Sequence, residues 1–284
     1  MHDARQHFRR GTRVPGYGHD VTVVDAADDE TPLSGGRWTA GVVRVGDTVR
    51  RRPSPSSAFV ADLLGHVHRA GFDGCPRYLG RDDVGRDMFS YMAGEVVPRW
   101  RRFDDVAVVA AGELLRRWHD ATRGFRGYDV VCHHDPGPNN AIFVAGRPIA
   151  WIDFDFAAPG DPIEDVAYVA WSWCISGRPD RGPAPEQAQQ VRLVADAYGL
   201  HRRDRLRLLA AIHEQLNRNV ATWQAVAARS RNPTADHPDA RLRANEVISW
   251  TRSEQRYVTG NGDAFTAALS RRSTFKIKGE PWYG

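Results

Sequence analysis

Hydrophobic and polar positions follow one period in the first third of this chain and another in the rest. Up to about residue 94, short apolar runs alternate with glycines, prolines and charged residues, a pattern typical of β-strands and turns. Further along, apolar residues recur every three or four positions, as on one face of amphipathic helices. The pattern predicts a polar arm at residues 1–20, a β-rich lobe at 21–94 and a larger, mostly helical lobe at 95–284.

The β-rich lobe is predicted to contain several strands and one helix. The helix should begin at Ser56 or Ser57, whose hydroxyls suit an N-cap, and run to about Ala70. The run 93–95, Ala-Gly-Glu, breaks the strand pattern and is the expected hinge to the second lobe. Strands are expected at residues 21–24, 41–45, 48–51, 76–80 and 87–92.

The second lobe is predicted to be mainly helical, with one hairpin near its start. Its first helix should carry Val106 and Val109 on its apolar face, and His119 and Asp120 at its end are expected on the surface or in packing contacts. Helices are expected at residues 103–123, 186–198, 203–229, 241–257 and 264–269, with a further one beginning near Asp165.

The most informative stretch runs from residue 130 to residue 173. Two apolar runs, 141–144 and 149–152, are separated by a turn at Gly146, which predicts a β-hairpin. Because the two strands of a hairpin are paired, Asn140 before the first run should lie near Asp153 after the second.

Polar residues gather at the open end of this hairpin. His133, Asp135 and Asn140 precede it, and Asp153 and Asp155 follow it. Carboxylate and amide oxygens suit Mg²⁺, and a carboxylate beside them can orient a hydroxyl and accept its proton. The set points to phosphoryl transfer; the alternative interpretation is two strands with an Asn-rich turn and a capping Asp.

The motif resembles that of the aminoglycoside phosphotransferase family, small-molecule kinases that share the protein-kinase fold. Residues 133–140 fit H-x-D-x-x-x-x-N, and the run 152–155, Ile-Asp-Phe-Asp, stands where kinases have D-F-G. The resemblance implies an α+β, bilobal protein-kinase-like fold. It also implies that Asp135 is the catalytic base, that His133 supports the loop, and that Asn140 and Asp153 bind Mg²⁺.

Two further acids in this region, Asp155 and Asp165, have other expected roles. Asp155 either assists metal binding or caps the turn that follows it. Asp165, in an E-D-V-A string, matches the start of a helix that has a structural role in the family.

In the first lobe, the run Ser34-Gly35-Gly36 is a candidate nucleotide loop, because glycines let backbone N–H groups approach phosphates; a plain turn is the alternative. Phe89, Tyr91 and Met92 are candidates for the wall of an adenine site, or for ordinary core packing.

This lobe departs from the kinase pattern, because it contains no lysine; the only lysines are Lys276 and Lys278. Arg50 or Arg51 must then hold the nucleotide phosphates, and Arg51 is preferred from its register in the strand. The following helix has no Glu, so Asp62 either pairs with that arginine or lies on the surface.

Composition narrows the class of protein. Of 284 residues, 42% are hydrophobic and 26% charged, and the formal net charge is +4, with arginines scattered rather than clustered, so nucleic-acid binding is not expected. No apolar run reaches the ~20 residues of a membrane helix, and the N-terminus lacks the apolar core of a signal peptide. Three cysteines form no C-x-x-C pair, so a cytoplasmic location is expected and a zinc site is not.

The prediction is a Mg²⁺-dependent transfer of the γ-phosphate of ATP or GTP to a hydroxyl of a small molecule. An aminoglycoside-type antibiotic is the first acceptor considered, in a resistance or self-protection role, and a cell metabolite such as a sugar or an amino alcohol is the second. The alternative function is a catalytically weak or inactive kinase-like protein that sequesters a small ligand. The oligomeric state is left open. Candidate acceptor-pocket residues are Glu214, Asn217, Asn219, Trp223, Glu246 and Trp250.

Overall fold

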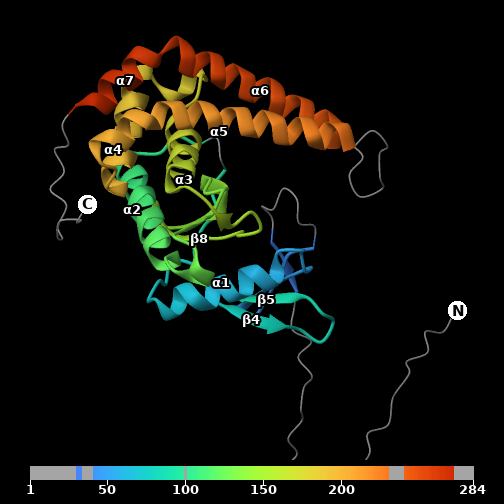
Figure 1. Ribbon diagram of the computed structural model, residues 1–284. Helices are drawn as coiled ribbons and strands as arrows, with labels where there is room; N and C mark the ends of the chain where they lie inside the picture. The colour runs from blue at the N-terminus through green and yellow to red at the C-terminus, as the bar shows by residue number, and fades with distance from the viewer. Residues whose placement is uncertain (1–29, 34–40, 99–100, 230–239, 272–284) are drawn as a thin grey trace, which may run out of the picture.

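A small antiparallel sheet and one helix form the first lobe of the computed structural model (Figure 1), which describes residues 30–33, 41–98, 101–229 and 240–271. The expected arm at 1–20, strand at 21–24 and glycine loop at 34–36 lie outside these residues. The sheet has the order β1-β2-β3-β5-β4, and every neighbouring pair is antiparallel. Its strands are β1 (Thr31–Pro32), β2 (Val43–Val45), β3 (Thr48–Arg51), β4 (Tyr78–Arg81) and β5 (Asp87–Ser90).

Helix α1 (Ser57–Arg69) lies against this sheet (Figure 1). Leu63 and Val67, four residues apart on one face of the helix, are fully buried. Ser56 is the N-cap by position, but its hydroxyl makes no capping hydrogen bond; it is turned instead toward Asp155 in the second lobe.

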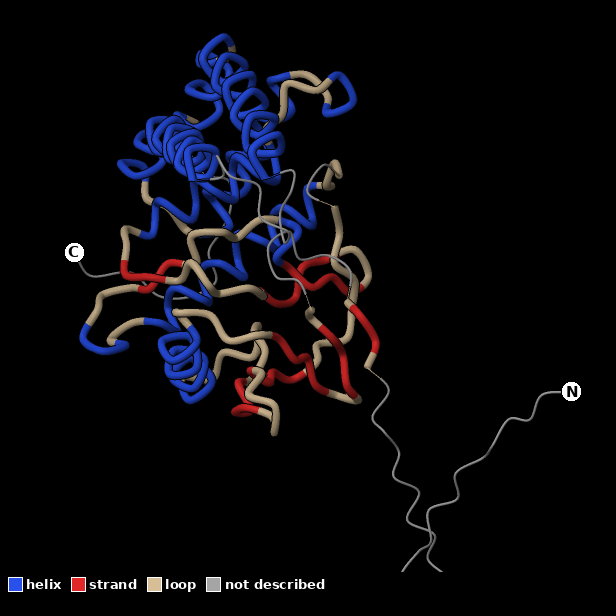
Figure 2. The backbone as a smooth tube through the Cα atoms, turned by 90° about the vertical axis from the view of Figure 1, so that its right-hand side faces the viewer, coloured by secondary structure: helices blue, strands red, loops and turns tan. Residues whose placement is uncertain are grey.

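The second lobe is a group of helices with the central hairpin at its boundary with the first. Figures 1 and 2 show the helices gathered at one end of the molecule and the sheet, with α1, at the other. Its helices are α2 (Asp105–Thr122), α3 (Pro162–Val169), α4 (Ala184–Tyr198), α5 (Arg202–Arg229), α6 (Ala240–Gly260) and α7 (Gly262–Ser270). Its strands are β6 (Val131–Cys132), paired with β9 (Ala158–Pro159), and β7 (Ala141–Val144), paired with β8 (Arg147–Trp151).

These elements confirm the predicted α+β bilobal architecture, and they correct the details of α2. The helix begins at Asp105, and the Asp104 carboxylate accepts a hydrogen bond from the Ala107 N–H at 2.8 Å, a standard N-cap. The predicted apolar face was wrong at Val106, which is 47% exposed. Val108 is fully buried instead, because the face that packs on the core is rotated from the one predicted.

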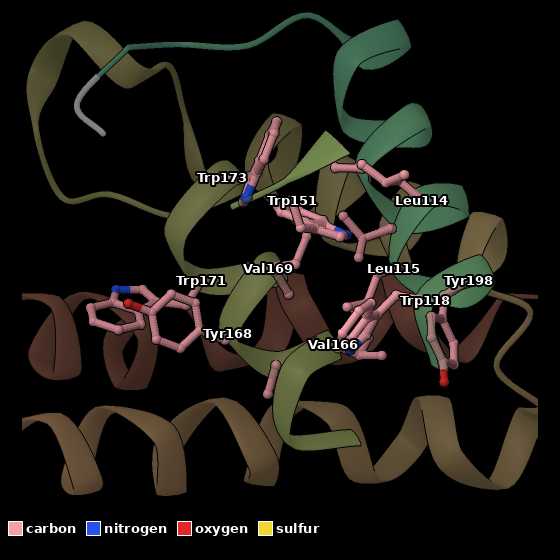
Figure 3. Close-up of a cluster of buried hydrophobic side chains, with 14 of the residues drawn as sticks. Leu114, Leu115, Trp118, Trp151, Val166, Tyr168, Val169, Trp171, Trp173 and Tyr198 are labelled. Carbon is pink, nitrogen blue, oxygen red and sulfur yellow. The ribbon is translucent and has the colours of Figure 1, made fainter. Parts of the chain in front are cut away.

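The core of the second lobe is built around tryptophans (Figure 3). Trp118, Trp151, Trp171 and Trp173 are all fully buried, and Figure 3 shows Trp118 and Trp151 between α2 and the helical stretch that begins with α3. Two of them also hold the backbone on either side of the loop that follows β6, because the Trp118 indole N–H donates to the Val131 carbonyl and that of Trp173 to the Pro136 carbonyl, each at 3.0 Å.

Among the helices of the described residues, none is both long and apolar enough to cross a membrane.

The predicted hinge at residues 93–95 is attached directly to the central hairpin. Glu95 and Phe143 exchange two backbone hydrogen bonds, of 2.9 and 2.8 Å. Gly94 has φ of +150°, and a Cβ placed on it would lie 2.6 Å from the Phe143 carbonyl oxygen. The hinge thus needs a glycine at this position.

A buried carboxylate ties the loop after β6 to the helices. Asp165, at the start of α3, accepts hydrogen bonds from the backbone N–H groups of His133 at 2.6 Å and His134 at 2.8 Å. His119 of α2 contacts the same carboxylate at 3.0 Å through Nε2 and the Tyr198 hydroxyl at 2.7 Å through Nδ1. His119 is therefore a packing residue, and Asp165 has the structural location that the resemblance implied.

Burial acts to raise the pKa of Asp165, but the hydrogen bond from His119 and the nearby histidines outweigh it, so the pKa is lowered. A carboxyl whose pKa is lower in the folded than in the unfolded chain stabilises the fold above its unfolded pKa of about 4. That stabilisation is lost as the pH falls through the folded pKa. Asp165 therefore supports the loop at neutral pH and less so in acid.

We expect Gly94→Ala to lower the free energy of unfolding by at least about 2 kcal/mol, because the new methyl group meets backbone that cannot move freely. Urea unfolding measures the change. Gly262→Ala is the matched control, since a Cβ there meets nothing within 4 Å. Equal stability of the two variants would contradict the close approach at the hinge.

Asp165→Asn should lower the free energy of unfolding by about 3 kcal/mol at pH 7, because an amide cannot accept from both backbone donors. The difference from wild type should narrow as the pH is lowered from 7 toward 3, which urea titrations at several pH values would show. Asp120→Asn, which removes exposed ion pairs with Arg116 and Arg123, is the control and should cost under about 1 kcal/mol. A pH-independent loss would show that the carboxylate charge is not what holds the loop.

Candidate functional site

The polar residues before and after the β7–β8 hairpin are brought together as the sequence predicts. The Ile152 N–H donates to the Asn140 carbonyl at 2.9 Å, which places the residue before β7 beside the end of β8. Asp153 follows at once, with a left-handed φ of +65° that turns its side chain away from the strand direction.

His133 lies beneath this loop and is fully buried. Its ring packs against Phe154 at 4.7 Å between centroids, and Nε2 contacts the Ile152 carbonyl at 3.1 Å. This position, between the loop and the strand end, suits a residue that supports the loop rather than one that reacts. The next residue, His134, has a left-handed φ of +62°.

The Asp135 carboxylate is oriented by two side chains. Asn140 Nδ2 donates to Asp135 Oδ2 at 2.8 Å and to the Asp135 backbone carbonyl at 2.9 Å, and the Tyr168 hydroxyl donates to Oδ1. With its Nδ2 used in this way, Asn140 keeps its Oδ1 for other partners, here the Asn139 amide at 2.9 Å.

Sequence reasoning missed Tyr168. The sequence spacing could have identified it. Tyr168 follows Asp165 by three residues on the helix predicted to start there, and residues three apart share a helix face. A helix whose first turn binds the loop backbone through Asp165 therefore points its next turn at Asp135.

The charged groups around Asp153 are mainly negative. Its partial withdrawal from water and the charges of Asp155 and Asp135 raise its pKa, and Arg51 opposes the shift without cancelling it. The Asp153 side chain is still 41% accessible. A divalent cation would relieve this repulsion, and the amide oxygen of Asn140 with the carboxylate of Asp153 is a donor set that fits Mg²⁺.

Of the two arginines considered for phosphate binding, Arg51 faces the site. Its Nη1 lies 3.4 Å from Asp153 Oδ1 and 3.1 Å from Asp155 Oδ2, and its Nη2 lies 2.5 Å from Asp155 Oδ1. Arg50 points the other way, with Nη1 3.7 Å from Asp82. Adjacent strand residues face opposite sides of a sheet, which is why only one of the pair reaches Asp153 and Asp155.

Asp62 proves to be a surface residue. It is ion-paired with Arg126 and 61% accessible, so it does not serve as the partner of Arg51. Its partner Arg126 belongs to the second lobe and lies just beyond the end of α2, so this ion pair joins the lobes away from Arg51.

The candidates for an adenine wall have different surroundings. Phe89 is 8% exposed and packs on Tyr78 and below the Arg51 guanidinium, at 5.5 and 5.2 Å, which is core packing. Tyr91 lies under Arg44 at 3.7 Å. Tyr91 and Met92 are both half-buried, and a role in nucleotide binding stays a prediction for them.

Several of the candidate pocket residues serve instead to join the long helices. Asn219 donates to Thr251 and Gln255 donates to Asn217, each at 2.7 Å, which links α5 to α6. Trp250 of α6 stacks on Trp171 with ring centroids 5.5 Å apart. Trp223 is buried, whereas Glu214 and Glu246 are exposed.

A second group of side chains that could bind a metal ion lies in the core, and its atoms are used in hydrogen bonds. His119, Cys132 and Asp165 bring one ligand atom each within 4.8 Å of one another. The Asp165 oxygens accept the hydrogen bonds described above, and burial raises the pKa of the Cys132 thiol, which disfavours the thiolate that a metal needs. These residues form a hydrogen-bond network of the core.

This chain is similar in sequence to known proteins. Residues 44–209 match the sequence profile of the phosphotransferase enzyme family, APH. The chain is 33% identical over 203 residues to the trifolitoxin immunity protein of Rhizobium leguminosarum bv. trifolii, which covers 63% of this chain and 77% of that protein.

Solved structures share the fold at low identity. A choline/ethanolamine kinase family protein from Mesorhizobium loti aligns with a TM-score of 0.56 at 18% identity, covering 81% of this chain and 88% of that one. An aminoglycoside phosphotransferase from Alicyclobacillus acidocaldarius aligns with a TM-score of 0.53 at 14% identity, covering 85% and 91%. The family match spans more than half of the chain and includes the loop and hairpin described above, and the chain therefore belongs to the phosphotransferase enzyme family.

Proposed function

We propose that this protein transfers the γ-phosphate of ATP or GTP to a hydroxyl group of a small molecule. The observation that carries the proposal is the convergence of Asp135, Asn140 and Asp153 at the open end of one hairpin. Asn140 connects the set, because its amide nitrogen is bonded to Asp135 while its backbone carbonyl is bonded to Ile152, the neighbour of Asp153.

Asp135 is the residue that binds the hydroxyl group of the acceptor molecule. Its carboxylate orients the acceptor hydroxyl and takes its proton as the new O–P bond forms. Tyr168 and Asn140 fix the direction of the carboxylate, and His133 supports the loop from below. Such alignment of two reactants can contribute about 7–11 kcal/mol to lowering the barrier.

The nucleotide side of the reaction belongs to Asn140, Asp153 and Arg51. Mg²⁺, when bound, supplies neutralisation of the phosphate charges during transfer. Asn140 and Asp153 would hold it, and Arg51 is placed to bind phosphate oxygens beside them. The loop at residues 34–36 and the half-buried Tyr91 and Met92 complete the proposed nucleotide site.

We further propose a protective role in the cytoplasm, where the nucleotide is available. The relative is named an immunity protein, and phosphorylation of a toxic small molecule is one way to provide immunity. The neighbours differ in acceptor by name, since one is a complex of gentamicin with APH(2")-IIa and another a choline/ethanolamine kinase family protein. An antibiotic-like molecule and a sugar or amino alcohol are therefore the two acceptor classes to test.

Sequestration without transfer is the second candidate, and two observations favour it. The lobe that should carry the phosphate-binding lysine has an arginine instead, and that arginine is already paired with Asp153 and Asp155. An immunity protein can also protect by binding alone. Against this, carboxylates that repel one another are costly to keep in a site that binds no cation.

Asp135→Asn should reduce phosphoryl transfer by at least about 100-fold while nucleotide affinity stays within about twofold of wild type. The reason is that the amide can still orient a hydroxyl but cannot accept its proton. ADP release over a panel of acceptors, including gentamicin, choline and ethanolamine, measures transfer, and calorimetry measures nucleotide affinity. An equal loss of both quantities would show that Asp135 holds the nucleotide instead.

Mg²⁺ with ATP or GTP should raise the melting temperature of the wild-type protein, because a ligand that binds only the folded state stabilises it. The Mg²⁺-dependent part of the rise should disappear in Asp153→Ala, since that variant loses a proposed metal ligand. Asp120→Asn, which changes an exposed side chain paired with Arg116 and Arg123, should behave as wild type. If neither nucleotide shifts the wild type, sequestration becomes the better proposal.

A further inference from the structure

The carboxylate of Asp155 is surrounded by hydrogen-bond donors from one short segment of the first lobe. Arg51 approaches it with both terminal nitrogens, at 2.5 and 3.1 Å. The hydroxyls of Ser54 and Ser56 donate to Oδ1 at 3.2 and 3.3 Å. All of these donors lie between the end of β3 and the start of α1, so this one side chain connects the two lobes.

These contacts leave Asp155 poorly suited to bind a metal. A carboxylate has about four lone-pair directions, and Oδ1 already accepts three hydrogen bonds while Oδ2 accepts a fourth. A cation at this carboxylate would also face the positive charge of Arg51. Asp153 differs, since its one contact with Arg51 is 3.4 Å long and its side chain is more accessible, at 41% against 26%.

Arg51 in turn depends on Asp155. Its side chain is only 10% accessible, with the Phe89 ring 5.2 Å from the guanidinium carbon. A buried arginine needs a charged partner, and end-on pairing with a carboxylate through two nitrogens fixes its plane. Its Nε–H is buried with no acceptor among the described residues, so the guanidinium keeps an unused donor.

Kinases usually hold the nucleotide phosphates with a lysine on this strand, paired with a glutamate on the helix that follows. Here that helix is α1, whose acid Asp62 is engaged with Arg126 on the surface. The cation remains on the strand as Arg51, but its carboxylate partner comes from the other lobe, two residues after Asp153.

We propose that Asp155 is the positioning residue that holds Arg51 for phosphate binding, in place of the absent glutamate, and that it is not a magnesium ligand. This inference rests on the proposed nucleotide-dependent function. Because Asp155 and Asp153 are separated by one residue, the same loop holds the phosphate-binding cation and the metal-binding carboxylate in a fixed relation.

The proposal is tested by a double-mutant cycle on nucleotide affinity, measured by calorimetry with ATP and with GTP, each in Mg²⁺ and in EDTA. Asp155→Asn should weaken binding at least about tenfold in both conditions, because the defect lies in the arginine and not in the metal. In the Arg51→Met background, Asp155→Asn should cause no further loss. Asp153→Ala, by contrast, should weaken binding in Mg²⁺ alone.

Two further variants keep the test decisive. Asp155→Glu retains the charge and should bind nucleotide within about threefold to fivefold of wild type, since a longer carboxylate can still reach the guanidinium. Asp120→Asn should have no effect, and melting temperatures without nucleotide check that each variant folds.

A loss in Asp155→Asn that appears only with Mg²⁺, or that persists in the Arg51→Met background, would make Asp155 a metal ligand and overturn this inference alone. Absence of nucleotide binding by the wild-type protein would overturn the inference together with the proposed function. The two failures are thereby distinguished.

Discussion

The site depends on a single buried carboxylate that fixes the loop after β6. Asp165 has no accessible surface, and it binds the backbone N–H groups of His133 and His134 from the first turn of α3. Since the loop backbone is held there, the residue that follows, Asp135, leaves the core in one direction. The same helix then presents Tyr168 to the Asp135 carboxylate. One short helix thus fixes the loop that carries the candidate base and supplies one of the two side chains that orient it.

The rest of the site is a balance of charge across the two lobes. Asp135, Asp153 and Asp155 come from the second lobe, and among the described residues Arg51 is the cation of the first lobe that contacts Asp153 and Asp155. The arginine is shared unequally, with short contacts to Asp155 and a long one to Asp153. Asp153 keeps the weaker contact with the cation, and partial burial together with the charges of Asp155 and Asp135 raises its pKa. The field therefore favours a cation at Asp153 and disfavours one at Asp155.

Much of this arrangement was predictable from local sequence, and the limits of prediction have a physical cause. The hairpin, and with it the approach of Asn140 to Asp153, follows from two apolar runs and a glycine turn, because strand pairing is set by short-range spacing. The contact of Asp155 with Arg51 joins residues more than a hundred positions apart, and nothing in the local pattern of either segment encodes it. The prediction for Val106 was wrong for a related reason. The spacing of apolar residues gives the period of a helix, but only tertiary packing decides which face is buried.

The substitution of arginine for lysine on β3 has consequences for the choice between transfer and sequestration. A lysine is a point charge that can follow the phosphate, whereas the arginine here is held in one plane by Asp155 and the ring of Phe89. A guanidinium held in one plane matches two oxygens at a fixed separation, and phosphate groups present such pairs of oxygens. Carboxylates that repel one another beside this arginine are costly to keep in a site that binds no cation. This cost therefore favours a site that binds nucleotide with its metal ion.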